Sequence, residues 1–381
     1  MKKRLGDYIK EYSVRNKENQ DIPVYSVTNT EGFCQDYFGK EVASKDKSTY
    51  KIVPQGYFAY NPSRINVGSV DWQRTQERVI VSPLYNVFSV SDKLDQQYLY
   101  YYLKSDFALQ RIKAVATGSV RDNLKLKMLY EFPINIPELS SQKNIVELLD
   151  KIKKIEGLKK AELDYFDTLV KARFVEMFEK ESDQWHHKKL VECCDNKNDI
   201  KCGPFGSQLH VEDYQNIGVP VYGIPEVNSG FKSNPKLYIS QQKAEELSAY
   251  SLIDGDVAVS RKGNVGQAAL FYDSLKNGII HSDVLRVRLN KQIMDPFFLI
   301  GELHFSQSIR NQVKQASNGA IMPGINVTKL KQIVVDIPPL AIQKEFSGFI
   351  QQVEKSKVAI NRCTVIIRKA LQSEYHHVWG D

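Results

Sequence analysis

The sequence contains no apolar run of about 18 residues, the length that a membrane-spanning helix needs. The chain begins Met1-Lys2-Lys3-Arg4-Leu5-Gly6-Asp7 and turns polar before the apolar region of a signal peptide could form. We therefore expect a cytoplasmic protein with no membrane partner. Cysteine is also scarce, with five residues in the chain. Their number is odd, and no two show the Cys-x-x-Cys spacing of a zinc ribbon. Reduced thiols and no metal site are the expectation.

Motifs that carry chemistry are absent as well. The sequence has no GxxxxGKS/T phosphate loop, no HExxH pair, no GxSxG elbow and no GxGxxG opening a helix. The pairs His186-His187 and His376-His377 have no third ligand nearby and are predicted to be solvated helix ends. Tyr60-Asn61-Pro62-Ser63 resembles the Asn-Pro-Pro-aromatic tetrad of adenine methyltransferases but lacks the second proline and the aromatic residue. We therefore expect a chain that is not an enzyme and that binds no cofactor itself.

The net charge is small for a chain of 381 residues, since 52 Lys and Arg against 45 Asp and Glu give +7. This excess alone does not indicate an anionic partner. Hydrophobic residues make up 42% and charged residues 25%, which is ordinary usage for folded proteins and excludes a disordered or fibrous chain. The length suggests two or three folding units.

What the sequence does contain is an internal repeat with an offset of about 200 residues. Asn66-Val67-Gly68 recurs as Asn264-Val265-Gly266, and Ile52-Val53-Pro54-Gln55-Gly56 is matched by Leu252-Ile253-Asp254-Gly255. The later parts of the two copies match more closely than the early parts. Ile136-Pro137 and Gln142-Lys143 recur as Ile337-Pro338 and Gln343-Lys344, both at an offset of 201 residues. One offset held over so many landmarks predicts two copies of one module. Each apolar segment closed by proline reads as an edge strand.

A long helical pattern follows each proline, over about 141–179 and 341–375. In the second copy Phe346, Val353, Ile360 and Ile367 repeat every seven residues, and Ile342, Phe349, Cys363 and Ala370 are predicted to fill the second seam. In the first copy the predicted packing residues are Ile145, Leu148, Ile152, Phe166 and Leu169, with a change of phase near Gly157. The heptads favour an antiparallel pair of coiled-coil helices. Two helices that each pack on their own globular part are the alternative.

The remaining segments predict globular parts built of short strands and helices. Val79–Ser82, Asp256–Ser260 and Val284–Leu289 are the clearest strands, because they are rich in β-branched residues. Each copy also has one aromatic-rich helix, around Gln97–Leu103 and Pro296–Ile300, whose rings are predicted to lie in the core rather than to stack on bases. The fold class is therefore α+β, with two repeated α/β domains of mixed or antiparallel sheet and short helices, separated by the long helices.

Each copy places a patch poor in acidic residues at the same point. No acidic residue occurs from Leu303 to Val335, and in the first copy the stretch from Arg111 to Lys127 has only Asp122. Basic and amide side chains of this kind position phosphates and read base edges. A solvated basic face is the simpler interpretation of any one residue, but the repetition favours nucleic acid. The candidate DNA-binding residues are Arg111, Lys113, Arg121, Asn123 and Lys125 with Asn61, Arg64 and Asn66, and, in the second copy, Arg310, Lys314, Asn318, Asn326 and Lys329 with Arg261, Lys262 and Asn264.

These features together resemble the specificity (S) subunit of type I restriction-modification enzymes. Ala172-Arg173-Phe174-Val175-Glu176-Met177-Phe178 is similar to that family's junction between modules. Gly203-Pro204-Phe205-Gly206-Ser207-Gln208-Leu209, Gly255-Asp256-Val257 and Gly263–Gly266 resemble landmarks of its target recognition domains, and Ser207 joins the candidate DNA-binding residues on this ground.

The resemblance implies four segments: target recognition domain 1 at 1–139, a central spacer helix at 140–180, target recognition domain 2 at 181–339, and a C-terminal spacer helix at 340–381, related by a pseudo-two-fold axis. It implies that each domain reads half of a bipartite site on double-stranded DNA and that the helix pair sets the spacing. Two methyltransferase (M) subunits and restriction (R) subunits are the implied partners, and S-adenosylmethionine, ATP and Mg are expected on those subunits. The alternatives are a subunit of a related type II bipartite-cutting system and a coiled-coil scaffold that binds only proteins.

Overall fold

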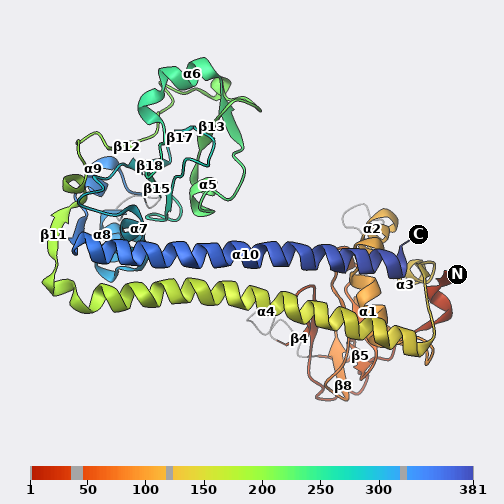
Figure 1. Cartoon of the computed structure of the whole chain (residues 1–381). Coiled ribbons are helices and arrows are strands. Elements are labelled where there is room, and N and C mark those ends of the chain that lie inside the picture. The colour runs from red at the N-terminus through yellow and green to blue at the C-terminus, as the bar shows by residue number, and fades with distance from the viewer. Residues whose placement is uncertain (1, 36–45, 117–122, 318–323, 381) are drawn as a thin grey trace. The chain divides into compact units, whose positions relative to one another are not determined.

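The computed structural model describes residues 2–35, 46–116, 123–317 and 324–380. The chain divides into two compact units: unit 1 is residues 1–160 with 361–381, and unit 2 is residues 161–360. Two long helices, α4 (Leu139–Met177) and α10 (Leu340–Trp379), each contribute one part to each unit (Figure 1). Within the described residues, no helix is both long enough and apolar enough to cross a membrane.

Unit 1 is built on a four-stranded antiparallel sheet with the order β2 (Ile9–Glu11), β9 (Asn86–Val90), β6 (Phe58–Tyr60), β7 (Val70–Trp72). Three two-stranded pairs accompany it: β3 (Ser26–Thr28) with β4 (Gly32–Cys34), β5 (Lys51–Pro54) with β8 (Arg78–Val81), and β1 (Lys3–Arg4) with β10 (Pro133–Ile134). The short helices are α1 (Gln96–Lys104), α2 (Asp106–Val115) and α3 (Leu126–Leu129). The rings of Tyr98 and Tyr102 on α1 are buried in the core.

Unit 2 repeats this plan with the sheet order β12 (Ile200–Cys202), β18 (Val284–Val287), β15 (Val257–Ser260), β16 (Ala268–Leu270). The strand β11 (His186–Lys189) pairs with β19 (Val334–Ile337), and the helices are α7 (Pro296–Phe305), α8 (Gln307–Ser317) and α9 (Val327–Lys331). A further sheet of unit 2 consists of β14 (Leu237–Ile239), β13 (Val219–Tyr222) and β17 (Ile279–Ile280), accompanied by α5 (Ile224–Asn228) and α6 (Gln241–Glu246).

The matching strand orders confirm the internal repeat and the predicted α+β fold class. The sheet β2-β9-β6-β7 corresponds strand by strand to β12-β18-β15-β16. Glycines at equivalent turns share a left-handed backbone, with φ of 90° at Gly68 and 89° at Gly266, a conformation that costs a glycine little. The strands predicted at 79–82, 256–260 and 284–289 and the two aromatic helices are also confirmed.

The repeated Gln-Lys pair has a structural explanation. Gln142 and Gln343 are completely buried in the first turn of α4 and α10. The Gln343 side chain accepts a hydrogen bond from Asp295 N (2.8 Å) and donates to the carbonyl oxygens of Ile293 (3.2 Å) and Pro338 (2.8 Å). Gln142 makes the same three bonds, to Asp95 N, Lys93 O and Pro137 O. Each glutamine thus fastens the start of a long helix to the start of the aromatic helix.

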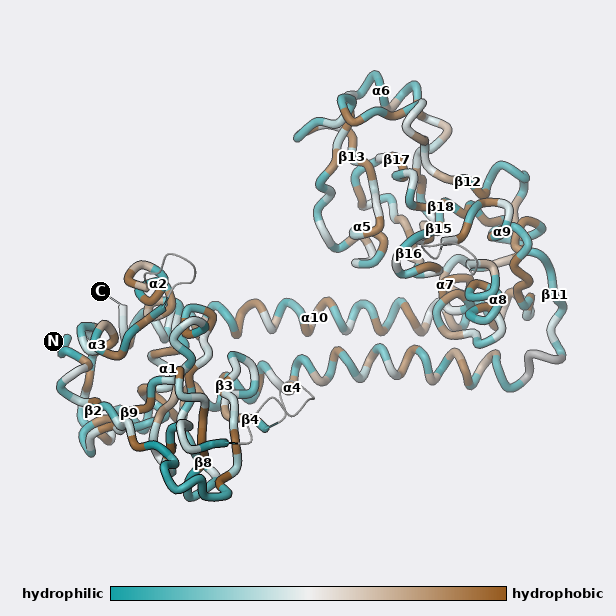
Figure 2. Tube along the Cα trace, turned by 180° about the vertical axis from the view of Figure 1, so that it is seen from behind, coloured by the Kyte–Doolittle hydropathy of each residue, from teal (hydrophilic) through white to brown (hydrophobic). Residues whose placement is uncertain are grey.

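The long helices pair within both units. In unit 1 Leu149 on α4 shares a hydrophobic core with Leu371 on α10, and in unit 2 Phe174 on α4 shares one with Phe346 and Val353 on α10. The start of α4 therefore meets the end of α10, and the end of α4 meets the start of α10, which is the antiparallel arrangement. Within each unit the helices also pack on the globular part, so the antiparallel pair and the packing on the globular parts are both present. Figure 2 shows apolar residues recurring along both helices.

The packing residues differ from the predicted set at one position and in the second seam. Leu148 is 43% exposed, and Leu149 takes its place in the core because the seam runs through 145, 149 and 152 without a change of phase at Gly157. The second seam of α10 lies four residues, not three, after the first, so that Cys363 and Ala370 are exposed. The structure places the other predicted residues as follows: Phe346, Val353 and Ile360 are buried, and Ile145, Ile152, Phe166, Leu169, Phe349 and Ile367 are partly buried.

Two local predictions were also wrong. His186 and His187 lie in strand β11 rather than at a helix end. In the first copy, β10 ends at Ile134, so Ile136-Pro137 is not part of a strand, whereas in the second copy β19 does end at Ile337, immediately before Pro338. The difference follows from the partner strands, since β1 offers two residues for pairing and β11 offers four.

Candidate nucleic-acid interface

In unit 1 a polar loop follows β6. Asn61 begins it, and its side-chain oxygen accepts hydrogen bonds from Ser63 N (3.1 Å) and Ser63 Oγ (2.9 Å), which fixes a tight turn. The turn leaves Arg64 exposed and Asn66 partly buried. Leu124 N donates to Pro62 O at 3.1 Å, so the exposed Asn123 lies beside the same loop.

Helix α2 packs against the loop at residues 65–67 and carries the predicted cations. Lys113 is exposed, and Arg111 is exposed with its guanidinium 5.6 Å from the centre of the Phe132 ring. Lys125, at the start of α3, is exposed as well. Arg121 lies outside the described residues. The structure therefore gathers most of the predicted cluster of the first copy around one loop.

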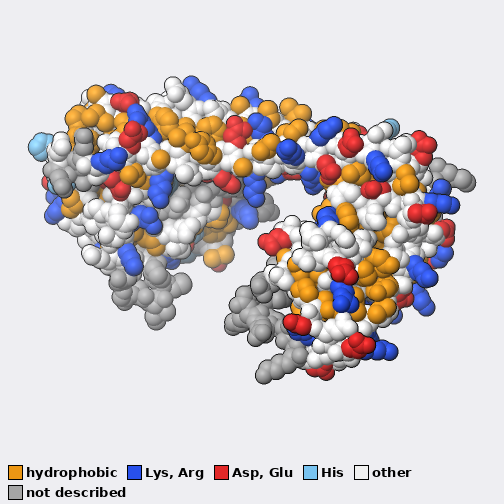
Figure 3. Space-filling model, turned by 90° about the horizontal axis from the view of Figure 1, so that it is seen from below, with side chains coloured by type: hydrophobic (Ala, Val, Ile, Leu, Met, Phe, Trp, Pro, Cys, Tyr) orange, Lys and Arg blue, Asp and Glu red, His pale blue; other side chains and the backbone are white. Residues whose placement is uncertain are grey.

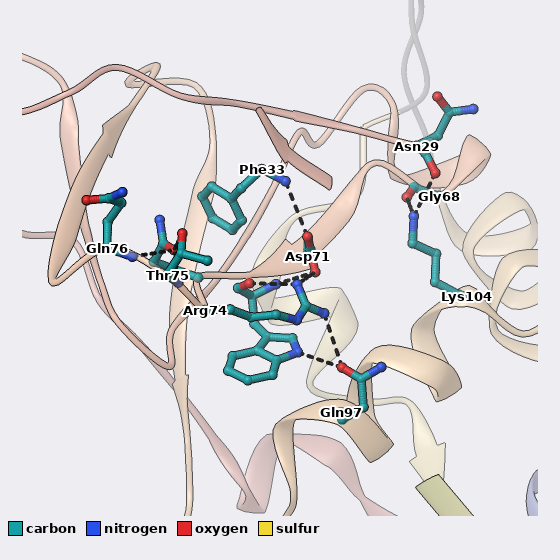
Figure 4. Close-up of polar contacts among 11 residues, drawn as sticks. Asn29, Phe33, Gly68, Asp71, Arg74, Thr75, Gln76, Gln97 and Lys104 are labelled. Carbon is teal, nitrogen blue, oxygen red and sulfur yellow. Dashed lines mark hydrogen bonds and ion pairs between the residues drawn. The ribbon is translucent and has the colours of Figure 1, made fainter. Parts of the chain in front are cut away.

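A lysine that was not predicted from the sequence also binds this loop. Lys104, the last residue of α1, donates from Nζ to the carbonyl oxygens of Gly68 and of Asn29 (3.1 Å), as Figure 4 shows. Burial lowers the pKa of Lys104. No spacing in the sequence marks this residue, because its two acceptors come from loops 36 and 75 residues away.

A second set of contacts in Figure 4 fixes the neighbouring strand β7 to α1. The carboxylate of Asp71, only 5% exposed, accepts from Arg74 (2.7 Å) and from Phe33 N (3.2 Å). The Arg74 guanidinium lies 4.5 Å from the centre of the Trp72 ring and donates to Gln97 Oε1 at 3.1 Å. These contacts hold the loop's flanking strand rigidly against the helix layer.

In unit 2 the equivalent loop follows β15. Ile325 N donates to Arg261 O at 3.0 Å, the counterpart of the bond between Leu124 and Pro62. The Arg261 side chain is partly buried, donates to Cys202 Sγ (3.3 Å) and Ser282 O (3.1 Å), and lies 5.7 Å from the centre of the Phe205 ring. Lys262 pairs with Asp283 at 2.8 Å. Both predicted cations of this loop are therefore engaged within the protein, whereas Asn264 and Ser207 are exposed.

Helix α8 supplies two exposed cations of unit 2. Arg310 and Lys314 lie one turn apart, are exposed, and form no ion pair with any of the described residues. They line a pocket of about 410 Å³ with Gln307, Asn311 and Gly266. An adjoining pocket of about 500 Å³ is lined by Arg310, Asn264 and Lys171, and Lys171, on α4, was not predicted from the sequence. Three cations and several amides thus border one hollow, an arrangement suited to phosphate oxygens.

Two predicted residues of α9 have structural roles instead. The Asn326 side chain accepts from Lys329 N at 2.8 Å and caps the helix, and Lys329 Nζ donates to Ala316 O. Asn318 lies outside the described residues. Among the described residues, no group of three His, Cys, Asp or Glu side chains is placed to hold a metal ion.

Comparison with known proteins connects this arrangement to a family. The family model for the type I restriction modification DNA specificity domain matches residues 3–165 and 183–367. The chain is 29% identical over 161 residues to the putative type I restriction enzyme MjaX specificity subunit of Methanocaldococcus jannaschii, which is 40% of this chain and 37% of that protein. It is 23% identical over 318 residues to the type I restriction enzyme EcoKI specificity subunit of Escherichia coli K12, which is 74% of this chain and 66% of that protein. The matched segments span no more than two thirds of either relative.

A solved structure shows the same fold. A chain from a structural study of complex assembly and conformational transition in the type I R-M system superimposes with a TM-score of 0.63 at 16% identity, covering 99% of this chain and 97% of that chain. The family model matches both repeats, so the chain belongs to the family of type I restriction modification DNA specificity domains.

Proposed function

We propose that this chain is the DNA-recognition subunit of a type I restriction-modification complex, in which each unit reads one half of a bipartite site on double-stranded DNA. The supporting observation is the repetition of one arrangement: a polar loop leaves β6 or β15 beside α2 or α8. Exposed cations border it, Arg64 and Lys113 in unit 1 and Arg310 and Lys314 in unit 2. Cations fix a protein on the phosphate backbone, and the loop amides read base edges.

The test is the salt dependence of duplex binding by the assembled complex. Removing one cation that binds a phosphate makes the slope of log K against log salt shallower by about 0.9. Arg310→Ala with Lys314→Ala should reduce the slope by about two and weaken binding to all sequences alike. Lys197→Ala, which removes an exposed cation of the same unit, is the matched control and should leave the slope unchanged. An unaltered slope in the double variant would favour a scaffold that binds only proteins.

The long helices set the spacing between the half-sites. Seven residues inserted in both α4 and α10 preserve the heptad seam and lengthen the pair by about 10 Å, or roughly three base pairs. Sequencing of methylated motifs from cells carrying the variant should report a longer spacer with both half-sites unchanged. Exchanging residues 1–139 should alter one half-site only. If the insertion left the spacer unchanged, the helices would not be the ruler.

The outer faces of the long helices dock the methyltransferase subunits. Leu148, Ile155, Leu158 and Tyr165 on α4 are 43–64% exposed, and Val358 and Val365 on α10 are 46% and 51% exposed. Their spacings of seven residues form apolar stripes that suit partner helices. Figure 3, which views the molecule from below, shows hydrophobic side chains exposed among charged ones on that face. Leu158→Lys with Val358→Lys should abolish co-purification of the methyltransferase subunits, while Glu147→Lys, on the same helix, should not.

Catalysis belongs to those partners. The methyltransferase subunits methylate adenines with S-adenosylmethionine, and the restriction subunits use ATP and Mg. This chain's part is to bind the duplex in the correct register and to present it to them. If the isolated chain bound S-adenosylmethionine, this division of labour would be wrong.

A further inference from the structure

Two of the ion pairs that join the long helices divide their charges in the same way. In unit 2, Lys357 on α10 lies 2.6 Å from the carboxylate of Asp167 on α4. In unit 1, Arg368 on α10 lies 3.0 Å from the carboxylate of Glu156 on α4. Helix α4 therefore supplies both acids, and α10 supplies both cations.

The repeat relates these two pairs to each other. The offset of 201 that carries Gln142 onto Gln343 also carries Glu156 onto Lys357 and Asp167 onto Arg368. The two ion pairs are thus one contact seen twice, and each position holds opposite charges in the two copies. The buried glutamines at the helix starts are identical and cannot tell one copy from the other.

We propose that this exchange of charge makes α4 and α10 select each other and reject a second copy of themselves. In the same antiparallel geometry, two α4 helices would place Glu156 opposite Asp167 twice, and two α10 helices would place Lys357 opposite Arg368 twice. Charges on facing helices set partner choice in this way. A chain built from two copies of one scaffold is exposed to pairing between chains, because each helix meets a near-copy of its proper partner on every other molecule.

A third ion pair has its charges the other way round, with the cation on α4 and the acid on α10, but it also disfavours the pairing of two α10 helices. Arg173 on α4 lies 2.8 Å from Glu345 on α10. The equivalent positions 201 residues away are Glu374 and Asn144. Two α10 helices would therefore bring Glu345 against Glu374, a further like-charged contact, while two α4 helices would meet at a neutral one.

The expected selectivity is moderate, because one partner in each pair is well exposed: Asp167 is 74% and Arg368 is 66% exposed at the side chain. Solvent weakens such pairs, and like-charged contacts cost about as much as opposite charges gain. Replacing two attractive contacts by two repulsive ones gives a preference of roughly tenfold to thirtyfold for the proper pairing. The inference rests on the repeat and the ion pairs, not on the proposed function.

The experiment uses three variants of the full chain. Glu156→Lys with Asp167→Lys makes both helices basic, and Lys357→Glu with Arg368→Glu makes both acidic. The fourfold variant carries all four changes and restores complementary charges in reversed order. We expect each double variant to unfold at a lower temperature than the original chain, and the fourfold variant to recover the original midpoint and mass.

Co-expression of the two double variants with different tags tests partner choice directly. The basic helices of one chain should pair with the acidic helices of the other and give a 1:1 dimer of twice 43.6 kDa by light scattering. Its yield should exceed by at least tenfold that from two differently tagged original chains. Glu147→Lys with Asp164→Lys is the control, because it makes the same change in charge at exposed positions of α4 that form no ion pair with the described residues.

The outcomes separate charge from packing. Recovery in the fourfold variant supports the inference even if neither double variant folds alone. A fourfold variant as unstable as the double variants would overturn it, as would a mixture containing no more mixed dimer than the original chains. A loss of stability that is the same in 50 mM and 1 M salt would also overturn it, because salt screens a charge effect.

Discussion

Replacing Gln343 by methionine tests how the long helices are fastened to the recognition parts. The side chain is fully buried and makes three hydrogen bonds, all to backbone groups: one from Asp295 N–H and two to the carbonyls of Ile293 and Pro338. Methionine has a similar shape and length but no amide. The substitution therefore leaves the cavity filled and removes only the polar contacts.

The expected loss follows from counting those contacts. A typical buried hydrogen bond contributes about 1 kcal/mol net, and a backbone group left without a partner costs about that or more. Three bonds give a loss of about 3 kcal/mol. For a unit of this size, 1 kcal/mol shifts the midpoint of thermal unfolding by about 2–4 °C, so we expect a fall of roughly 6–12 °C.

Urea and thermal unfolding of the full chain measure this loss. Gln351→Met, at an exposed position of the same helix, is the control and should stay within about 0.5 kcal/mol of the original chain. Gln142→Met, which breaks the equivalent three bonds in unit 1, should cost about as much as Gln343→Met. A Gln343→Met chain as stable as its control would refute the reasoning, because the amide bonds would then contribute nothing beyond packing.

Three other substitutions test buried groups. Trp379→Ala should destabilise unit 1 by about 3–5 kcal/mol in calorimetry, because the ring is 1% exposed and lies 5.2 Å from that of Tyr98; a loss below about 1 kcal/mol would show that the chain end is not anchored. Burial raises the pKa of Glu302 from 4.5 to about 8, so the folded state keeps a proton that the unfolded state releases, and stability falls as pH rises from about 4.5 to 8. Glu302→Gln should remove that fall and add about 3 kcal/mol at pH 7 in urea unfolding, and an unchanged pH profile would contradict this. Burial lowers the pKa of His304 from 6.5 to about 4, so the unfolded state gains a proton first and stability falls as pH drops from about 6.5 to 4. His304→Gln should flatten this decline in urea unfolding. If the decline persisted in the variant, it would come from another group.

The features that the sequence predicted best are those carried by local patterns or by the repeat. The two aromatic helices and the clearest strands follow from residue type and periodicity, because burying one face needs apolar residues at fixed spacing. The repeat predicted that both units share one plan, and the strand orders β2-β9-β6-β7 and β12-β18-β15-β16 agree with it. Which leucine enters the helix seam was not predictable in this way: Leu148 and Leu149 are adjacent, and the partner helix decided which of them is buried.

For the candidate interface, too, the sequence predicted the location of the loops but not the contacts of their side chains. The sequence located loops rich in Arg, Asn and Lys in both copies, but it could not show which side chains remain uncommitted. Arg261 and Lys262 are held by Ser282 and Asp283, and Asn326 caps a helix, whereas Arg310 and Lys314 are exposed. The partners of Arg261 and Lys262 lie 21 residues away in the sequence, so only folding reveals them.

The amino-acid sequence by itself determined that the chain consists of two copies of one module, each ending in a long amphipathic helix, because the repeat and the heptads are properties of residue order. The tertiary structure alone decided which residues face each other. It placed Lys104 behind the loop at Gly68, brought Lys171 to the hollow beside Arg310, and set Glu156 against Arg368 and Asp167 against Lys357. The physical reason is that burial and pairing depend on distances through space between elements, and those distances are fixed only when distant segments pack together.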